Sequence, residues 1–176
     1  MRDPDTAGHV WRVGEIAAAL GAELGFDERR QQGLRIAGYL HDIGKIATPA
    51  EILTRPGRLT PEELALIKCH ASAGFAILSN VKFPWPVALV PLQHHGRMDG
   101  SGYPQGLKGE EITLKARIVM VADVVEAMSS HRPYRPALGI EQALAEIGRG
   151  RGTAFDADVT DARLRLFRKK AYRLPR

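Results

Sequence analysis

The residues of this chain best suited to chemistry are histidines and aspartates on separate apolar segments. His9 lies four and seven residues before Val13 and Ile16, which places it on an apolar stripe of helical spacing. Asp123 lies in the nearly continuous apolar run 118–125. A buried carboxylate without a partner is costly, so these flanking patterns indicate paired or metal-bound side chains. Seven candidate metal ligands fall on or at the ends of five separate predicted helices, which can direct them into a common core: His9, His41, Asp42, His70, His94, His95 and Asp123.

Imidazole and carboxylate together favour Fe, Mn or Zn as the bound metal. Cys69 is the only cysteine, which excludes a thiolate zinc site and an internal disulfide. Two carboxylates and five histidines exceed what one ion needs, so we expect a pair of ions with one bridging carboxylate. Two ions about 3.5–4 Å apart stabilise the attacking and leaving oxygens of phosphoryl chemistry and supply hydroxide at neutral pH.

Each of these residues also has a purely structural interpretation. Any single histidine can be a hydrogen-bonded core imidazole, and Asp123 can form an ion pair with Arg117. Three cations fit a phosphate substrate: Lys45, four residues after His41, and the arginines Arg132 and Arg135. Each of the three, taken alone, can equally be a surface cation.

The elements that must position these residues are all helical by pattern. Apolar residues recur at three- and four-residue steps from Val10 to Leu24, and no segment alternates as a strand does. The stretch 96–109 holds five glycines in 14 residues and predicts a long functional loop. The predicted helices are 10–24, ended by Gly25; a second capped by Asp27 and reaching Leu40; one from the Thr60 capping box through His70 and Ala71; Trp85–His95, kinked at Pro91; Leu114–Ser129; Ile140–Ile147; and 156–170. We therefore expect a single all-α domain, a bundle of about seven helices around a metal site.

The composition is that of an ordinary globular domain. The chain has 176 residues, of which 44% are hydrophobic and 26% charged, and this excludes wholesale disorder. The longest apolar run, Phe83–Leu92, has ten residues and is too short to cross a bilayer. No charged-then-apolar leader opens the chain. These features predict no membrane partner and a cytoplasmic location.

The positive charge is concentrated at the C-terminus. The net charge is +5, and residues 149–176 carry nine Lys or Arg against three Asp. From Arg163 to Arg176 there are seven basic residues and no acidic one. A nucleic-acid protein more often spreads such charge over a face that also carries groove-reading elements, so we expect no nucleic-acid duplex as partner. The prediction is a basic, solvated C-terminal helix over 157–176, with contact to a partner as the alternative.

Several motifs together resemble a known family. The string His41-Asp42-Ile43-Gly44-Lys45, with His70, the pair His94-His95 and Asp123, resembles the HD superfamily of metal-dependent phosphohydrolases. The segment 99–104, Asp-Gly-Ser-Gly-Tyr-Pro, is similar to the HD-GYP subgroup, as are segments 56–60, 106–109 and 132–135. The resemblance runs from about Asp3 to Asp156, which covers nearly the whole chain.

The resemblance implies a catalytic domain, residues 1–176, that hydrolyses cyclic di-GMP to linear pGpG and/or GMP. It implies that the seven candidates bind two divalent ions, Fe or Mn first, with Zn, Ni or Mg as alternatives. It makes Asp42 the bridging ligand, gives Asp42 and Lys45 catalytic roles, and assigns substrate contacts to Lys45, Arg132, Arg135, Gly102 and Tyr103. Tyr103 can alternatively pack its loop onto the core. Implied partners are GGDEF-domain proteins, through the loop Gly102-Tyr103-Pro104, and an upstream receiver or sensor domain outside this chain.

Two departures from the family pattern leave alternatives open. Asp5 replaces a Glu that helps to hold a third metal in some members, and we expect two ions here. Gly96 replaces the usual Glu after His94-His95, so a carboxylate that orients a ligand is predicted to be missing. One alternative function is hydrolysis of another cyclic dinucleotide or nucleotide. The other is a catalytically weak regulatory module that docks on GGDEF partners, which Gly96 favours.

Overall fold

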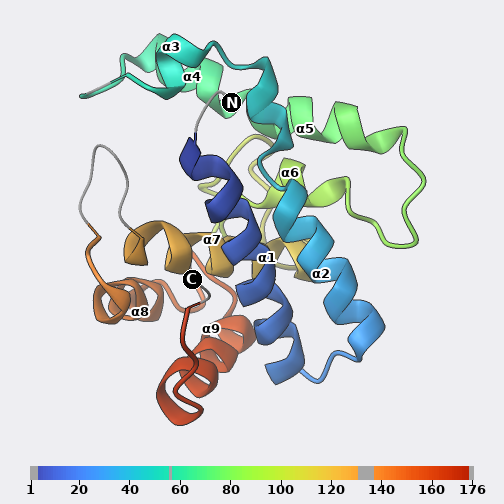
Figure 1. The fold of residues 1–176 in the computed structure, drawn as a ribbon, viewed down its shortest axis with the longest axis vertical. Helices are drawn as coiled ribbons and strands as arrows, with labels where there is room; N and C mark the ends of the chain where they lie inside the picture. The colour runs from blue at the N-terminus through green and yellow to red at the C-terminus, as the bar shows by residue number, and fades with distance from the viewer. Residues whose placement is uncertain (1–3, 56, 131–136, 175–176) are drawn as a thin grey trace.

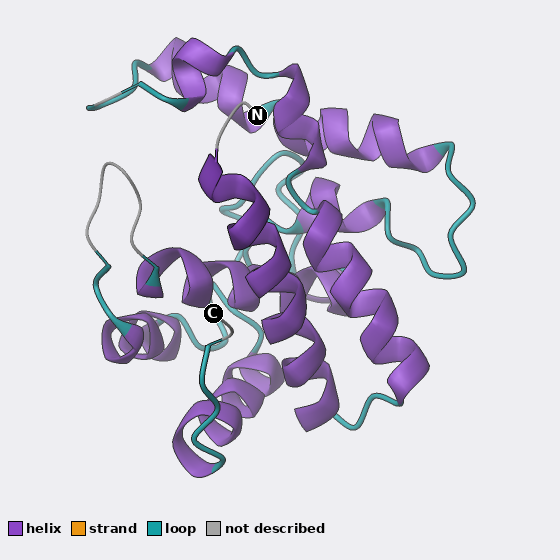
Figure 2. Ribbon diagram, in the orientation of Figure 1, coloured by secondary structure: helices purple, strands orange, loops and turns teal. Residues whose placement is uncertain are grey.

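The computed structural model describes residues 4–55, 57–130 and 137–174 (Figure 1). All regular structure in these ranges is helical, and they contain no β-strand (Figure 2). The only strand-like pairing among them is one isolated bridge between Arg151 and Phe155. The predicted all-α class is confirmed.

Helices α1 (Pro4–Glu23) and α2 (Glu28–Leu40) form an antiparallel pair. The turn between them contains Gly25 at φ 79°, and Asp27 caps α2 by accepting a hydrogen bond of 2.7 Å from the Arg30 amide. The helices touch backbone to backbone, since a Cβ on Gly38 would lie 2.5 Å from Gly14 Cα. The predicted end of the first helix before Gly25 and the predicted Asp27 cap of the second are confirmed, although α1 begins at Pro4, six residues before the predicted start. The close contact fixes α1 against the end of α2.

Helix α7 (Leu114–Ser129) is the centre of the core and contacts α1, α2, α6, α8 and α9. Its bounds are those predicted from the sequence. Ile118, Val119, Val121 and Val125 are completely buried, and burying one such side chain stabilises the fold by about 1.5–3 kcal/mol. Helices α8 (Ile140–Arg149) and α9 (Ala157–Leu164) cover α7 on one side (Figure 1).

A second set of shorter elements lies beyond the end of α2. It comprises the 3₁₀ turn η1 (Ile43–Ala47), α3 (Ala50–Leu53), α4 (Pro61–Lys68), α5 (His70–Ser79) and α6 (Leu89–Gln93). The capping box predicted at Thr60 is confirmed: the Thr60 hydroxyl accepts from the Glu63 amide at 3.2 Å, and the Glu63 carboxylate accepts from the Thr60 amide at 2.9 Å.

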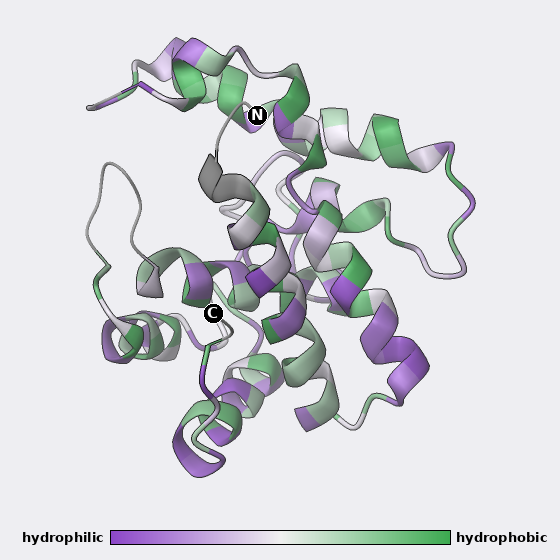
Figure 3. Ribbon diagram, viewed as in Figure 1, coloured by the Kyte–Doolittle hydropathy of each residue, from purple (hydrophilic) through white to green (hydrophobic). Residues whose placement is uncertain are grey.

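Helices α3 and α4 form an arm, residues 50–68, at one end of the molecule (Figure 1). Neither helix contains a fully buried residue. Hydrophobic side chains nevertheless occur on the arm (Figure 3), where Leu64 and Leu66 remain 44% and 48% exposed. The arm therefore adds little to the core, unlike α1 and α7.

Two helix predictions upstream of α7 need correction. The helix expected from residue 61 through Ala71 is interrupted at Cys69, where α4 ends and α5 begins. The helix expected over Trp85–His95 is wrong in its first half, because only Leu89–Gln93 is helical. Pro86 lacks an amide donor and disfavours a helical conformation at Trp85, which explains the shorter helix. The break at Cys69 and the short helix α3, which was not predicted, raise the number of α-helices among the described residues above the expected seven.

The predicted C-terminal helix 157–176 is also too long. Helix α9 ends at Leu164, a π-helical turn, η3 (Arg165–Lys169), follows, and residues 170–174 are not helical. The chain turns back because the Phe167 and Tyr172 rings pack edge to face with centroids 5.4 Å apart. Lys170 forms an ion pair with Glu23 of α1, so part of the basic surplus is neutralised within the fold.

Within the part of the chain that the structure describes, no helix combines the length and the apolar character needed to span a membrane.

Candidate metal centre

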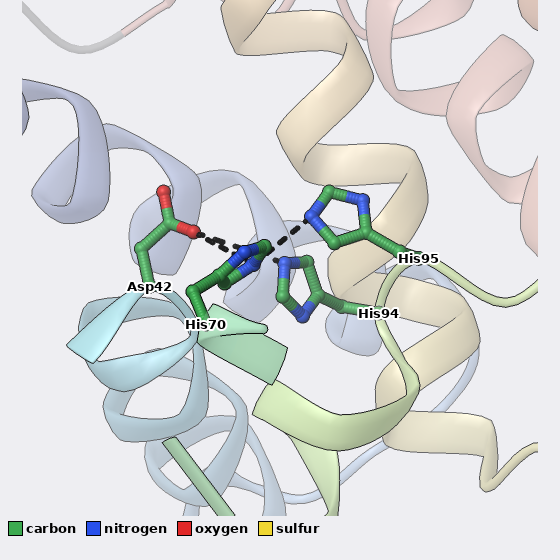
Figure 4. A group of neighbouring side chains, drawn as sticks. All are labelled: Asp42, His70, His94 and His95. Atoms are coloured by element: carbon green, nitrogen blue, oxygen red, sulfur yellow. Dashed lines mark hydrogen bonds and ion pairs between the residues drawn. The ribbon is translucent and has the colours of Figure 1, made fainter. Parts of the chain in front are cut away.

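The seven predicted ligands come together at one place in the fold, in two groups. Within each group the ligand atoms lie within 4.8 Å of one another. The core group comes from the long helices α1 and α7 and the end of α2; it comprises His9, His41 and Asp123. The loop group comes from η1, α5 and the end of α6, and Figure 4 shows its side chains converging: Asp42, His70, His94 and His95.

Asp42 lies between the two groups. Its Oδ1 atom is 3.5 Å from His70 Nε2 and 3.9 Å from His94 Nε2. Its Oδ2 atom is 3.4 Å from His41 Nε2 and 3.8 Å from His9 Nε2. One oxygen of the same carboxylate therefore faces each group, which is the arrangement that a bridging ligand requires.

Backbone carbonyls orient three of the imidazoles. A carbonyl oxygen only accepts hydrogen bonds, so the ring nitrogen facing it carries the proton and the other nitrogen keeps its lone pair. The three Nδ1 atoms donate to carbonyls three residues earlier: His41 to Gly38 at 2.6 Å, His70 to Ile67 at 2.7 Å, and His94 to Pro91 at 2.9 Å. The Nε2 atoms of all three rings are thereby directed at Asp42, where they hold a lone pair in the neutral ring.

This donor set fits a metal cation. The Nε2 atoms of His41 and His94 are buried and have no hydrogen-bond partner among the described residues. The Nε2 atoms of His70 and His95 lie only 3.2 Å apart. Buried acceptors that face one another and lack donors are stabilised when a cation binds between them.

The electrostatics of the site differ among its ligands. For His9 and His41 burial lowers the pKa, but the neighbouring carboxylates outweigh it and raise the pKa above its usual value, so a binding metal must displace a proton there. Burial lowers the pKa of His70, of His94 and of His95, the last to about 4, so these imidazoles are neutral. Burial alone would raise the pKa of Asp42, but the charges of His41 and Lys45 hold it well below its usual value. The carboxylate between the two groups is therefore ionised.

The alternative interpretation of Asp123, an ion pair with Arg117, is wrong. Arg117 Nη1 donates to Asp156 Oδ2 at 2.5 Å, at the start of α9. Asp123 Oδ1 instead lies 3.3 Å from His9 Nε2 and 3.9 Å from His41 Nε2. Burial would raise the pKa of Asp123, and its hydrogen bond with His9 and the charge of His41 lower it instead.

Glu126 belongs to the site but was missed in the sequence. It is only 1% exposed, and its carboxylate accepts hydrogen bonds from His9 Nδ1 and, at 2.8 Å, from Arg12 Nε. Burial would lower the pKa of His9, but hydrogen bonds with Asp123 and Glu126 raise it to about 9. The available signal was the spacing: Glu126 follows Asp123 by three residues and shares its helix face.

Glu126 also bears on the prediction that Gly96 leaves the site without a carboxylate that orients a ligand. A Cβ on Gly96 would lie 2.8 Å from Ile112 Cδ1 and 3.0 Å from the Gln93 carbonyl oxygen, and Ile112 is completely buried. In this chain Ile112 occupies the space beside residue 96. The site nevertheless has an orienting carboxylate, because Glu126 accepts a hydrogen bond from His9 Nδ1.

The predicted substrate-contacting residues are only partly covered by the structure. Lys45 is half-buried and its Nζ donates to Asp42 Oδ2 at 2.5 Å. The Tyr103 ring stacks on His95, and Gly102 lies so close to the chain after His95 that its Cβ would be 2.5 Å from the His95 carbonyl oxygen. Arg132 and Arg135 lie outside the described residues, as does the side chain of Asp5.

Comparison with known proteins gives sequence relatives of stated activity. The cyclic di-GMP phosphodiesterase response regulator RpfG of Xanthomonas campestris is 43% identical over 93% of this chain. The 3′3′-cGAMP-specific phosphodiesterase 3 of Vibrio cholerae is 37% identical over 89% of it. The matches cover 44% and 34% of these relatives, so this chain spans less than half the length of either.

A solved structure and a family comparison agree with these relatives. Bd1817, an HDG"Y"P protein of Bdellovibrio bacteriovorus, has a similar fold with a TM-score of 0.72 and 23% identity, over 89% of this chain and 50% of that one. Residues 1–159 match the HD domain family. With the His-Asp pair at the centre of the ligand set, the chain belongs to the HD domain family, and its relatives agree with the HD-GYP subgroup that its motifs predict.

Proposed function

We propose that this chain is a catalytic domain that hydrolyses cyclic di-GMP in a metal-dependent reaction. The 3′–5′ phosphodiester is opened to give linear pGpG and/or GMP. The observation that carries the proposal is the position of Asp42, with one carboxylate oxygen toward each group of imidazoles. The similarity to a named cyclic di-GMP phosphodiesterase supports the substrate.

The proposed ligands are the core group and the loop group together, with two divalent ions shared through Asp42. The ions are Fe or Mn first, with Zn, Ni or Mg as alternatives. When bound, such a pair supplies hydroxide from water at neutral pH and withdraws charge from the phosphate. His70, His94 and His95 contribute neutral lone pairs, and His9 and His41 do so once a binding metal displaces their protons. The two aspartates reduce the net positive charge of the centre.

Lys45 is the described cation best placed to act on the substrate. It lies at the bridging carboxylate, with Nζ 2.5 Å from Asp42 Oδ2. A cation held there stabilises the phosphate on binding and the extra negative charge of the transition state. Arg132 and Arg135 remain predicted phosphate contacts, and Gly102 and Tyr103 remain predicted neighbours of the substrate.

A second candidate substrate is 3′3′-cGAMP, because a relative at 37% identity is named for it. The metal centre would serve either dinucleotide, since both present a 3′–5′ phosphodiester. The two candidates differ only in their bases. Docking to GGDEF proteins, an upstream regulatory domain and a cytoplasmic location also remain predictions.

The test is a product assay on protein loaded anaerobically with Fe²⁺ or Mn²⁺. Equal concentrations of cyclic di-GMP, 3′3′-cGAMP and cyclic di-AMP are supplied, and products are separated by chromatography. We expect pGpG or GMP from cyclic di-GMP at the highest rate, and none from an Asp42→Ala control. Fully loaded protein that cleaves none of the three would contradict the proposal.

A further inference from the structure

The five histidines of the metal centre differ in how their rings are held. Three donate Nδ1 to backbone carbonyls, and His9 donates Nδ1 to Glu126. His95 differs: among the described residues its only ring-nitrogen contact is between its Nε2 and His70 Nε2, at 3.2 Å. Its ring therefore needs another source of orientation to serve as a ligand.

Tyr103 makes contacts that can orient the His95 ring. Its ring stacks on His95 with centroids 4.6 Å apart and an interplanar angle of 20°. The Tyr103 amide also donates to the His95 carbonyl oxygen at 3.1 Å. The backbone amide and the ring of Tyr103 therefore both hold His95. The stacked Tyr103 ring restricts rotation of the His95 imidazole, whose Nδ1 has no hydrogen bond among the described residues.

The loop that carries Tyr103 is built for this contact. A Cβ on Gly102 would lie 2.5 Å from the Arg97 amide nitrogen and from the His95 carbonyl oxygen, so glycine is required for the chain to return this close. Asp99 accepts from the amide and hydroxyl of Ser101, and its own amide donates to the Thr153 carbonyl at 2.8 Å. The loop is thus tied to the connection between α8 and α9, not free in solvent.

The arm contacts the same ring. Lys68, the last residue of α4, places Nζ 4.9 Å from the centroid of the Tyr103 ring, within the range of a cation–π interaction. Tyr103 therefore touches a metal-ligand candidate and the arm at once.

We propose that Tyr103 is a positioning residue: its ring fixes the imidazole of His95 and thereby sets the metal affinity of the loop group. The phenol hydroxyl has no part in this role. The proposal rests on the metal centre of the proposed function, but it does not require that the chain hydrolyse a cyclic dinucleotide.

The test is a titration of metal-free protein with Mn²⁺, followed by the paramagnetic signal of the free ion. Three variants are compared with the parent: Tyr103→Leu, Tyr103→Phe and Lys68→Met. We expect Tyr103→Leu to weaken one of two Mn²⁺ sites by about 10–100-fold, the usual effect of removing a residue that orients a ligand. Tyr103→Phe, which keeps the stacked ring, retains the parent affinity, and Lys68→Met changes it less than Tyr103→Leu.

A double-mutant cycle separates positioning from a general loss of structure. In a His95→Ala background, Tyr103→Leu is expected to cause no further loss of Mn²⁺ affinity, because the ring then has no ligand to hold. Circular dichroism on every variant checks that the helices are intact, and Tyr103→Phe and Lys68→Met carry the comparison if Tyr103→Leu does not fold. In that case a Tyr103→Phe protein with weakened Mn²⁺ affinity would overturn the proposal, because the stacked ring is still present.

Three results overturn the inference. They are parent affinity at both sites in folded Tyr103→Leu, equal losses in Tyr103→Phe and Tyr103→Leu, and an undiminished loss in the His95→Ala background. Failure of the proposed function would give a different result. A protein whose variants show the expected Mn²⁺ affinities but that cleaves no cyclic dinucleotide contradicts the proposed hydrolysis and leaves the role of Tyr103 intact.

Discussion

The two halves of the metal centre are supported in different ways. The core group lies on α1, α7 and the end of α2, which pack along their length and bury the apolar core. The loop group lies on short elements that also meet backbone to backbone: a Cβ on Gly44 would lie 1.9 Å from the His70 carbonyl oxygen. Close backbone contact occurs in both halves, since Gly38 meets Gly14 between α1 and α2, but the core group is placed by long helices and the loop group by short elements.

This difference predicts which changes affect one half and which affect both. Asp42 presents one carboxylate oxygen to each group, Glu126 contacts only the core group, and Gly44 contacts only the loop group. Variants at these positions test whether the halves are independent.

The largest effect is expected from Asp42→Ala. Loss of the shared carboxylate removes a ligand from both groups, so both ions should be lost and hydrolysis abolished. The measurement is metal content by elemental analysis after anaerobic loading, with Asp42→Asn as a variant of nearly the same shape. One ion retained at parent affinity would mean that Asp42 does not bridge.

Glu126→Gln is expected to weaken metal binding in the core group only. His9 would lose the charged acceptor that fixes its ring, and the removal of such a partner typically costs about 10–100-fold in metal affinity. Mn²⁺ titration should show one weakened and one unchanged site. Glu146→Gln, on the exposed face of α8, is the matched control and should change neither site. Equal weakening of both sites would contradict the independence of the halves.

Gly44→Ala should destabilise the loop group through packing. The new methyl group must push η1 away from α5, and such overpacking typically costs about 1–3 kcal/mol of unfolding free energy. Urea unfolding measures this cost. Gly148→Ala in α8 is the control, because its Cβ would meet nothing nearer than 4.0 Å. Equal unfolding free energies for the two variants would refute the role of close backbone contact.

The smallest effect is expected from Thr60→Ala, which removes the cap of α4. Loss of such a cap costs about 1 kcal/mol, and because the arm lies apart from α1 and α7 the core group should bind metal as before. Thr60→Ser keeps the hydroxyl and should retain the parent stability in thermal unfolding. A core-group affinity that falls with Thr60→Ala would show that the arm and the core are coupled.

The two halves of the metal centre also differ in how much of their structure could be predicted from the sequence. Caps at Asp27 and Thr60, and the bounds of α7, depend on neighbouring residues and were predicted correctly. The helical spacing of apolar residues also predicted that the side chains of His9 and Asp123 point into the core. In contrast, the pairing of His9 with Glu126 joins residues 117 positions apart, and no local pattern encodes such a contact.

The errors have two kinds of cause, one local and one that depends on packing. The helix predicted over Trp85–His95 ignored the effect of Pro86 on its neighbour, and the helix predicted over 157–176 ignored the tertiary contact between Phe167 and Tyr172. The environment of Gly96 could not be predicted because it depends on Ile112, which lies 16 positions away in sequence and fills the space beside Gly96. The first outcome was decided by the adjacent residue, whereas the other two depended on side-chain contacts formed when the chain folds back.

The most direct test of the central claim is anomalous diffraction from crystals of the Mn²⁺-loaded protein. We predict two peaks about 3.5–4 Å apart on either side of the Asp42 carboxylate, one among the core group and one among the loop group. A single peak, or ions bound away from these seven side chains, would contradict the account.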